Sequence, residues 1–100
     1  MNEEWIDAGE DEIDAELLAE VNKITGKTHP DPLTPEGFIF ILDEIEARDW
    51  TWTLTKMHVH TTMTLYYSGY EALSVHKNMY RAVFLCYLDV LTDSNNRQLL

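Results

Sequence analysis

The apolar residues change their period at Trp50, and this change limits the folds that are open to the chain. Before Trp50 they recur every three or four residues, which indicates amphipathic helices. From Trp50 onward they alternate with polar residues, which indicates β-strands, and a third apolar segment returns to the helical period. In a chain of 100 residues this order predicts one α+β domain.

The first helix is expected at about residues 10–25, and Gly26 is its predicted C′ residue. A connector with two prolines follows and cannot continue the helix. Thr34 and Pro35 then supply an N-cap and a proline at N1, which predicts the start of a second helix. The apolar stripe of this second helix consists of Phe38, Ile41, Leu42 and Ile45.

The alternating segment predicts an antiparallel hairpin with an apolar face and a threonine face. Trp50, Trp52 and Leu54 alternate with threonines, and the pattern resumes from Thr62 to Tyr67. The turn is expected near residues 57–60. The alternation ends at residues 68–70, and a third helix is expected at about residues 74–92.

The expected order is α-α-β-β-α, with the hairpin covered by helices. Pairing of the hairpin edge with a second copy, giving a four-stranded sheet across a homodimer, is an alternative arrangement. The third helix is apolar around much of its circumference, so it is buried on more than one side or faces a partner. The predicted homodimer surface consists of Ile39, Phe40, Phe84 and Leu88.

Acidic residues are concentrated at the N-terminus. Nine of the first twenty residues are Asp or Glu and none is Lys or Arg, so this segment carries −9 of the net charge of −11. Concentrated charge attracts a basic partner surface, and it disfavours direct binding to nucleic acid or to an anionic membrane. The predicted organisation is an acidic arm at residues 1–9, a domain at residues 10–93 and a tail at residues 94–100.

The acidic segment also contains Trp5, and an apolar anchor among acids is typical of a docking segment. A solvating tail, or Trp5 folding back onto the first helix, are the alternatives. The predicted partner-binding residues are Glu3, Glu4, Trp5, Glu10, Asp11, Asp14 and Glu16.

No catalytic residue and no cofactor is predicted. Cys86 lies on the apolar stripe of the third helix and is expected to be a buried structural thiol. His58 and His60 would share a face of an extended strand and could bind a metal with His76 or a carboxylate as a third ligand. The alternative is a polar hairpin tip that keeps the strand edge soluble.

Residues 34–91 resemble the phage ABA-sandwich domain family. The resemblance rests on the helix end at residues 43–50 (DEIEARDW), the Trp- and Thr-rich hairpin, the joint at residues 70–72 (YEA) and the helix at residues 80–83 (YRAV). It implies a phage origin and no known enzyme chemistry. At the level of class, the chain is similar to small acidic phage anti-defence proteins, including anti-CRISPR proteins and DNA mimics.

We therefore expect a non-catalytic phage-type protein in the cytoplasm of a bacterial host. It would inhibit a host nucleic-acid-binding defence complex by presenting carboxylates to a basic groove. Two alternatives stay open. One is an oligomeric structural or assembly protein of a phage, and the other is a small metal-binding protein or enzyme that uses His58 and His60.

Overall fold

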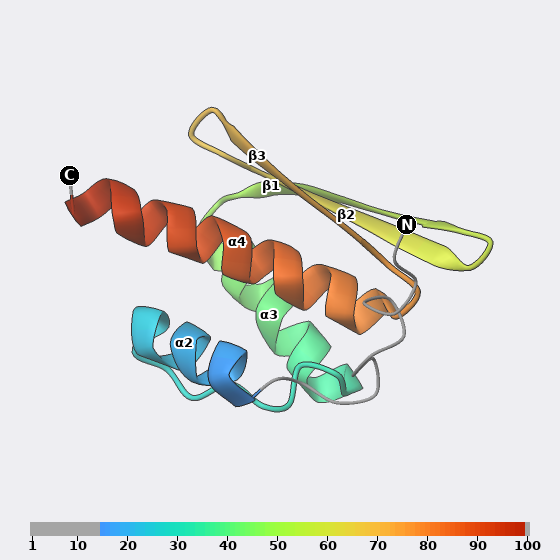
Figure 1. Cartoon of the computed structure of the whole chain (residues 1–100), viewed down its shortest axis with the longest axis horizontal. Helices are drawn as coiled ribbons and strands as arrows, with labels where there is room; N and C mark the ends of the chain where they lie inside the picture. Colours follow the sequence, from blue (N-terminus) through green and yellow to red (C-terminus); the bar gives the residue numbers. More distant parts are fainter. Residues whose placement is uncertain (1–14, 100) are drawn as a thin grey trace.

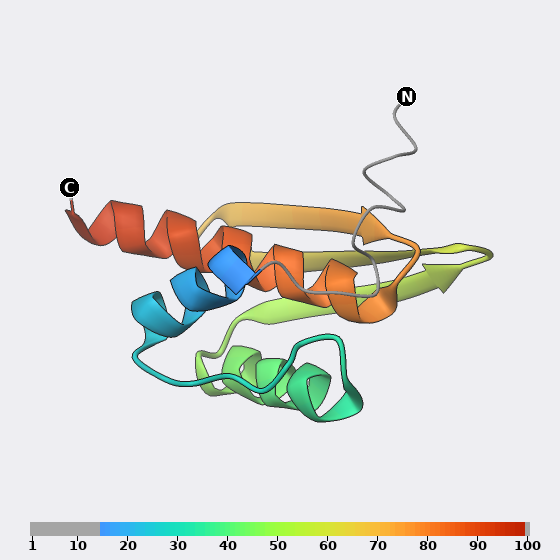
Figure 2. The same cartoon turned by 60° about the horizontal axis from the view of Figure 1, so that its bottom comes forward.

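The structure, a computed structural model, describes residues 15–99, with the side chains given through Ser94. Helix α4 lies across one face of an antiparallel sheet, and helices α2 and α3 pack against α4 (Figures 1 and 2). The sheet order is β1-β2-β3. The bounds are α2 Ala15–Thr25, α3 Pro35–Ala47, β1 Thr51–Met57, β2 His60–Tyr67, β3 Tyr70–His76 and α4 Met79–Leu99.

The α+β class is confirmed, but the expected order lacked a strand. Residues 68–70 do not end the sheet, because Ser68 and Gly69 have φ values of 46° and 85° and form a two-residue turn between β2 and β3. Positive φ at both central positions is the requirement of a type I′ hairpin turn. The observed order within the described residues is therefore α-α-β-β-β-α.

The start of the last helix was also expected too early. Helix α4 begins at Met79 and not near residue 74, because Asn78 caps it. Asn78 Oδ1 accepts hydrogen bonds from the backbone N–H groups of Tyr80 at 2.9 Å and Arg81 at 3.2 Å. The helix continues to Leu99, so residues 94–99, expected as a tail, are helical.

The first hairpin agrees with its sequence prediction. Its turn is formed by His58 and Val59, with Met57 paired to His60. Trp52 pairs with Leu65, and Leu54 with Met63, so these side chains share the face that the helices cover. The opposite, outer face carries Thr51, Thr53, Thr55, Thr62 and Thr64, whereas Thr61 is buried on the covered face.

The local signals of α2 and α3 are confirmed as well. Gly26 has a φ of 72° and follows the last residue of α2, as a C′ glycine does. Thr34 Oγ1 accepts a hydrogen bond from the N–H of Gly37 at 3.1 Å, and Pro35 occupies N1 of α3.

None of the helices in residues 15–99 has both the length and the apolar character that crossing a membrane requires.

Helix α4 supplies most of the core. The helix is buried on more than one side, which explains its apolar circumference, because the sheet covers one side and α2 and α3 pack against it elsewhere. Its buried residues are Ala82, Val83, Phe84, Cys86, Tyr87, Val90 and Leu91.

Gly37 permits the close approach of α3 to the preceding connector, and this yields a stability prediction. A β-carbon at Gly37 would collide with the backbone carbonyl of Asp31. We expect Gly37→Ala to lower the free energy of unfolding by about 1–3 kcal/mol, because the overpacking outweighs the better helix propensity of alanine. Urea denaturation measures the change. Asp43→Ala, on the exposed face of α3, is the control and is expected to stay within about 0.5 kcal/mol of wild type; equal stability of Gly37→Ala would contradict the prediction.

Candidate functional site

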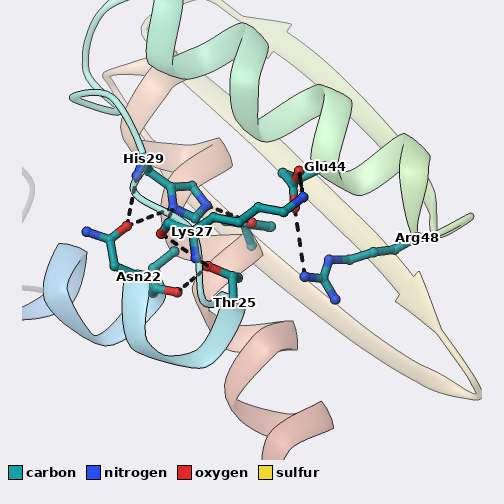
Figure 3. Close-up of polar contacts among 8 residues, drawn as sticks. Asn22, Thr25, Lys27, His29, Glu44 and Arg48 are labelled. Carbon is teal, nitrogen blue, oxygen red and sulfur yellow. Dashed lines mark hydrogen bonds and ion pairs between the residues drawn. The ribbon is translucent and has the colours of Figure 1, made fainter.

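A polar cluster lies where the connector between α2 and α3 meets α4 (Figure 3). His29 is at its centre and is only 4% exposed. The imidazole ring packs edge-on against Phe40 of α3, with ring centroids 4.9 Å apart. Phe40 does not belong to the apolar stripe of α3, and this contact with His29 covers part of its ring.

The hydrogen bonds of His29 fix its tautomer. Asn22 Oδ1 accepts a hydrogen bond from the backbone N–H of His29 at 2.9 Å and lies 2.8 Å from Nδ1. A carbonyl oxygen can only accept, so Nδ1 carries the proton. Nε2 is then an acceptor, and the Tyr87 hydroxyl donates to it at 3.0 Å. Both ring nitrogens are therefore satisfied.

Burial keeps this pair of side chains neutral. It lowers the pKa of His29 below its usual 6.5, more than the neighbouring Lys27 carbonyl and Glu44 raise it. Burial also raises the pKa of Tyr87. A general base needs a ring nitrogen within reach of a substrate proton. Since Nε2 is already bonded to a buried hydroxyl, the arrangement is typical of a structural contact.

Glu44 extends the cluster to α3. Its side chain is 12% exposed and lies 2.7 Å from Lys27 Nζ and 3.8 Å from Arg48. Lys27 belongs to the connector and Arg48 follows α3, so the carboxylate joins the two segments. Together with Val21, which is fully buried in the core, the cluster fixes α2 relative to the domain.

The structure describes part of the acidic segment. Glu16 is exposed in the first turn of α2, and Glu20 is exposed one turn later on the same helix. A spacing of four residues puts both carboxylates on one helical face. The other predicted partner-binding residues lie outside the described residues: Glu3, Glu4, Trp5, Glu10, Asp11 and Asp14.

The residues predicted to form a homodimer surface do not share one exposed patch. Ile39 is 56% exposed on α3. Phe40 is half-buried against His29, and Leu88 is half-buried against the core. Phe84 is fully buried within the monomer, so it does not contribute to a surface.

The expected pairing of His58 and His60 on one strand face is wrong, because His58 lies in the turn with a φ of 47°. Within the described residues, no group of three or more His, Cys, Asp or Glu side chains is placed so that it could hold a metal ion.

Cys86 is buried, its thiol donates to the Ala72 carbonyl at 3.3 Å, and burial raises its pKa to about 12. It has the surroundings of a structural thiol.

The sequence prediction missed one surface feature. Leu73 and Val75 of β3 lie on the outer face of the sheet and are 62% and 37% exposed. The register places them beside Thr64 and Thr62 of β2. We define these four residues with Thr53, Thr55 and Tyr66 as the outer sheet patch. The Ser-Gly dipeptide at residues 68–69, a turn signal, could have revealed that a further strand follows.

The burial of neutral His29 predicts a pH-dependent stability. Above the unfolded-state pKa of about 6.5, His29 is neutral in both states and its contribution is complete. As the pH falls from there to the lower folded-state pKa, the unfolded state binds the proton first and stability is lost. His29→Gln should therefore reduce the dependence of unfolding free energy on pH in this window.

Urea denaturation at pH 5 to 8 measures this slope, whose largest value for one proton is about 1.4 kcal/mol per pH unit. His58→Gln, in the exposed turn, is the matched control. If His29→Gln keeps the wild-type slope, His29 is not the group responsible.

Comparisons with models of protein families, with curated proteins and with solved structures found no match. Support for a function therefore comes from the charge distribution and the surface of the chain itself.

Proposed function

We propose that this is a non-catalytic interaction protein whose acidic N-terminal segment, residues 1–20, binds a basic surface of a partner protein. The observation that carries the proposal is the charge distribution: nine acids and no base in these twenty residues. A field of this kind raises the rate and the specificity of association with an oppositely charged surface.

The geometry of α2 supports this proposal. Recognition of spaced charges requires ordered carboxylates, because a rigid segment loses less conformational freedom on binding. Val21 anchors α2 to the core, and Asn22 holds the following connector through its bonds to His29. Glu16 and Glu20 are thus presented on an attached helix.

The proposed partner is a nucleic-acid-binding protein, because such proteins carry basic grooves that neutralise phosphates. Carboxylates on a folded scaffold can occupy a groove of this kind. Within this class we propose a host defence complex, which the resemblance to small acidic phage proteins favours.

The partner proposal is tested by affinity capture from a bacterial lysate with the full chain. Proteins that bind nucleic acid should be retained at about 0.1 M salt, released by a short DNA duplex, and lost at about 0.5 M salt, where the Debye length is only about 4 Å. A quadruple variant that neutralises Glu10, Asp11, Asp14 and Glu16 as amides should lose them.

The matched control neutralises four exposed acids elsewhere and makes the same change in net charge. It carries Glu36→Gln, Asp43→Asn, Asp49→Asn and Glu71→Gln. If both variants lose the captured proteins equally, total charge and not the acidic segment is responsible for binding. Capture by the first variant, or captured proteins that a DNA duplex does not release, would contradict the proposal.

The outer sheet patch favours a second candidate function, self-association of a structural protein. The seven residues of the patch are uncharged in a chain of net charge −11, and Glu71, the partner of Tyr66 in the sheet, lies at its edge. A face that combines threonine methyl groups with Leu73 and Val75 is suited to burial against a second copy.

Sedimentation over a concentration series separates the possible dimer surfaces. If the outer sheet patch is the interface, Leu73→Lys should convert a dimer into a monomer, because it buries an unpaired charge. Ile39→Lys, on α3, is the matched change at the surface first expected and should leave the dimer intact. A wild-type protein that stays monomeric removes this second candidate.

A further inference from the structure

Three basic residues lie toward the end of the molecule where β3 leads into α4. Lys56 of β1 pairs with Thr61, and Thr61 pairs with His76, so Lys56 lies two strands from the end of β3. Lys77 follows β3 directly, and Arg81 lies in the first turn of α4. We define Lys56, Lys77 and Arg81 as the basic patch.

The basic patch is accessible to solvent. Lys56 and Lys77 are exposed, and Arg81 is half-buried. The first turn of α4 contains no acidic residue, although the positive end of the helix dipole favours one there. The patch therefore brings three formal positive charges to one end of an acidic protein.

The segment that precedes Ala15 has the complementary charge. Its fourteen residues contain seven acids and no base. We propose that residues 3–14, which belong to the acidic N-terminal segment, dock on the basic patch of the same molecule. The occupant is thus the chain's own N-terminal segment, and the contact does not depend on the partner proposed above. The acids are Glu3, Glu4, Asp7, Glu10, Asp11, Glu12 and Asp14.

The segment is long enough to reach this end of the molecule. In both views α2 runs in the same general direction as α4, and its first turn lies about midway along α4 (Figures 1 and 2). Fourteen extended residues can span about 46–50 Å, whereas the longest extent of the molecule is 36 Å. Chain length therefore does not prevent residues 3–14 from reaching the patch.

A covalent tether makes even weak ion pairs effective. Exposed ion pairs contribute little individually, but a short flexible tether gives an effective local concentration in the millimolar range. Opposite charges within a Debye length of about 10 Å at 0.1 M salt attract each other, and higher salt screens them. Any basic partner must then displace the patch before it can bind these acids.

Zero-length carbodiimide cross-linking of the full chain tests the contact, because it joins only carboxylates and amines in direct contact. Peptide mass spectrometry should find residues 3–14 joined to Lys56 and Lys77. A mixture of isotopically light and heavy protein distinguishes links within one molecule from links between two. We expect links within one molecule at low salt and their loss at about 0.5 M salt.

Lys23 is the matched internal control, since it is exposed and is nearer in sequence to the segment. A segment that does not dock would meet Lys23 at least as often as Lys56 or Lys77. Equal linking of Lys23, yields that do not change with salt, or links only between molecules would each overturn the proposal.

A variant provides a second readout without a chemical reagent. Lys56→Gln with Lys77→Gln should accelerate cleavage of residues 3–14 by a Glu-specific protease about two- to thirtyfold, the range expected when two exposed ion pairs are lost. Lys23→Gln should leave the rate unchanged. An unchanged cleavage rate in a fully folded double variant would contradict the proposal.

Discussion

The rest of the structure depends on the burial of α4 on more than one side. Phe84 and Tyr87 are fully buried on this helix, and the sheet, α2 and α3 all contact it. Apolar burial of this extent is the largest favourable contribution to folding in a small domain. Tyr87 also bonds to His29, so the same helix fixes the connector. The position of α2, and of the exposed carboxylates Glu16 and Glu20, therefore follows from the packing of α4.

The parts of the fold that were predicted from the sequence depend on local chemistry. The N-cap at Thr34, Pro35 at N1 and Gly26 at C′ each act within one helical turn, and the structure confirms all three. The first hairpin was predictable for a similar reason. Its alternation places Trp52 and Leu54 on the covered face, as burial of a sheet face requires.

The parts that were not predicted depend on contacts between residues distant in sequence, or on a strand whose large apolar residues face outward. In β3 the apolar Leu73 and Val75 face outward while His76 is buried, so hydrophobicity alone suggests the wrong face and the wrong period. His29 and Tyr87 are 58 residues apart in sequence, and nothing near either residue indicates the other. Most of the predicted acidic site lies outside the described residues, so only the position of Glu16 is given by the fold.

Charge distribution, and not total charge, decides which partner the acidic segment can select. Seven of the eleven net negative charges precede Ala15, while Lys56, Lys77 and Arg81 lie toward one end of the domain. If the segment docks on its own basic patch, a weakly basic protein cannot replace that contact. A groove with several closely spaced cations can replace the contact, because its attraction for the segment grows with the number of opposed charges. The effective concentration that the covalent link provides is fixed. An intramolecular contact of this kind would raise specificity at the cost of apparent affinity, since specificity is a difference between two binding free energies.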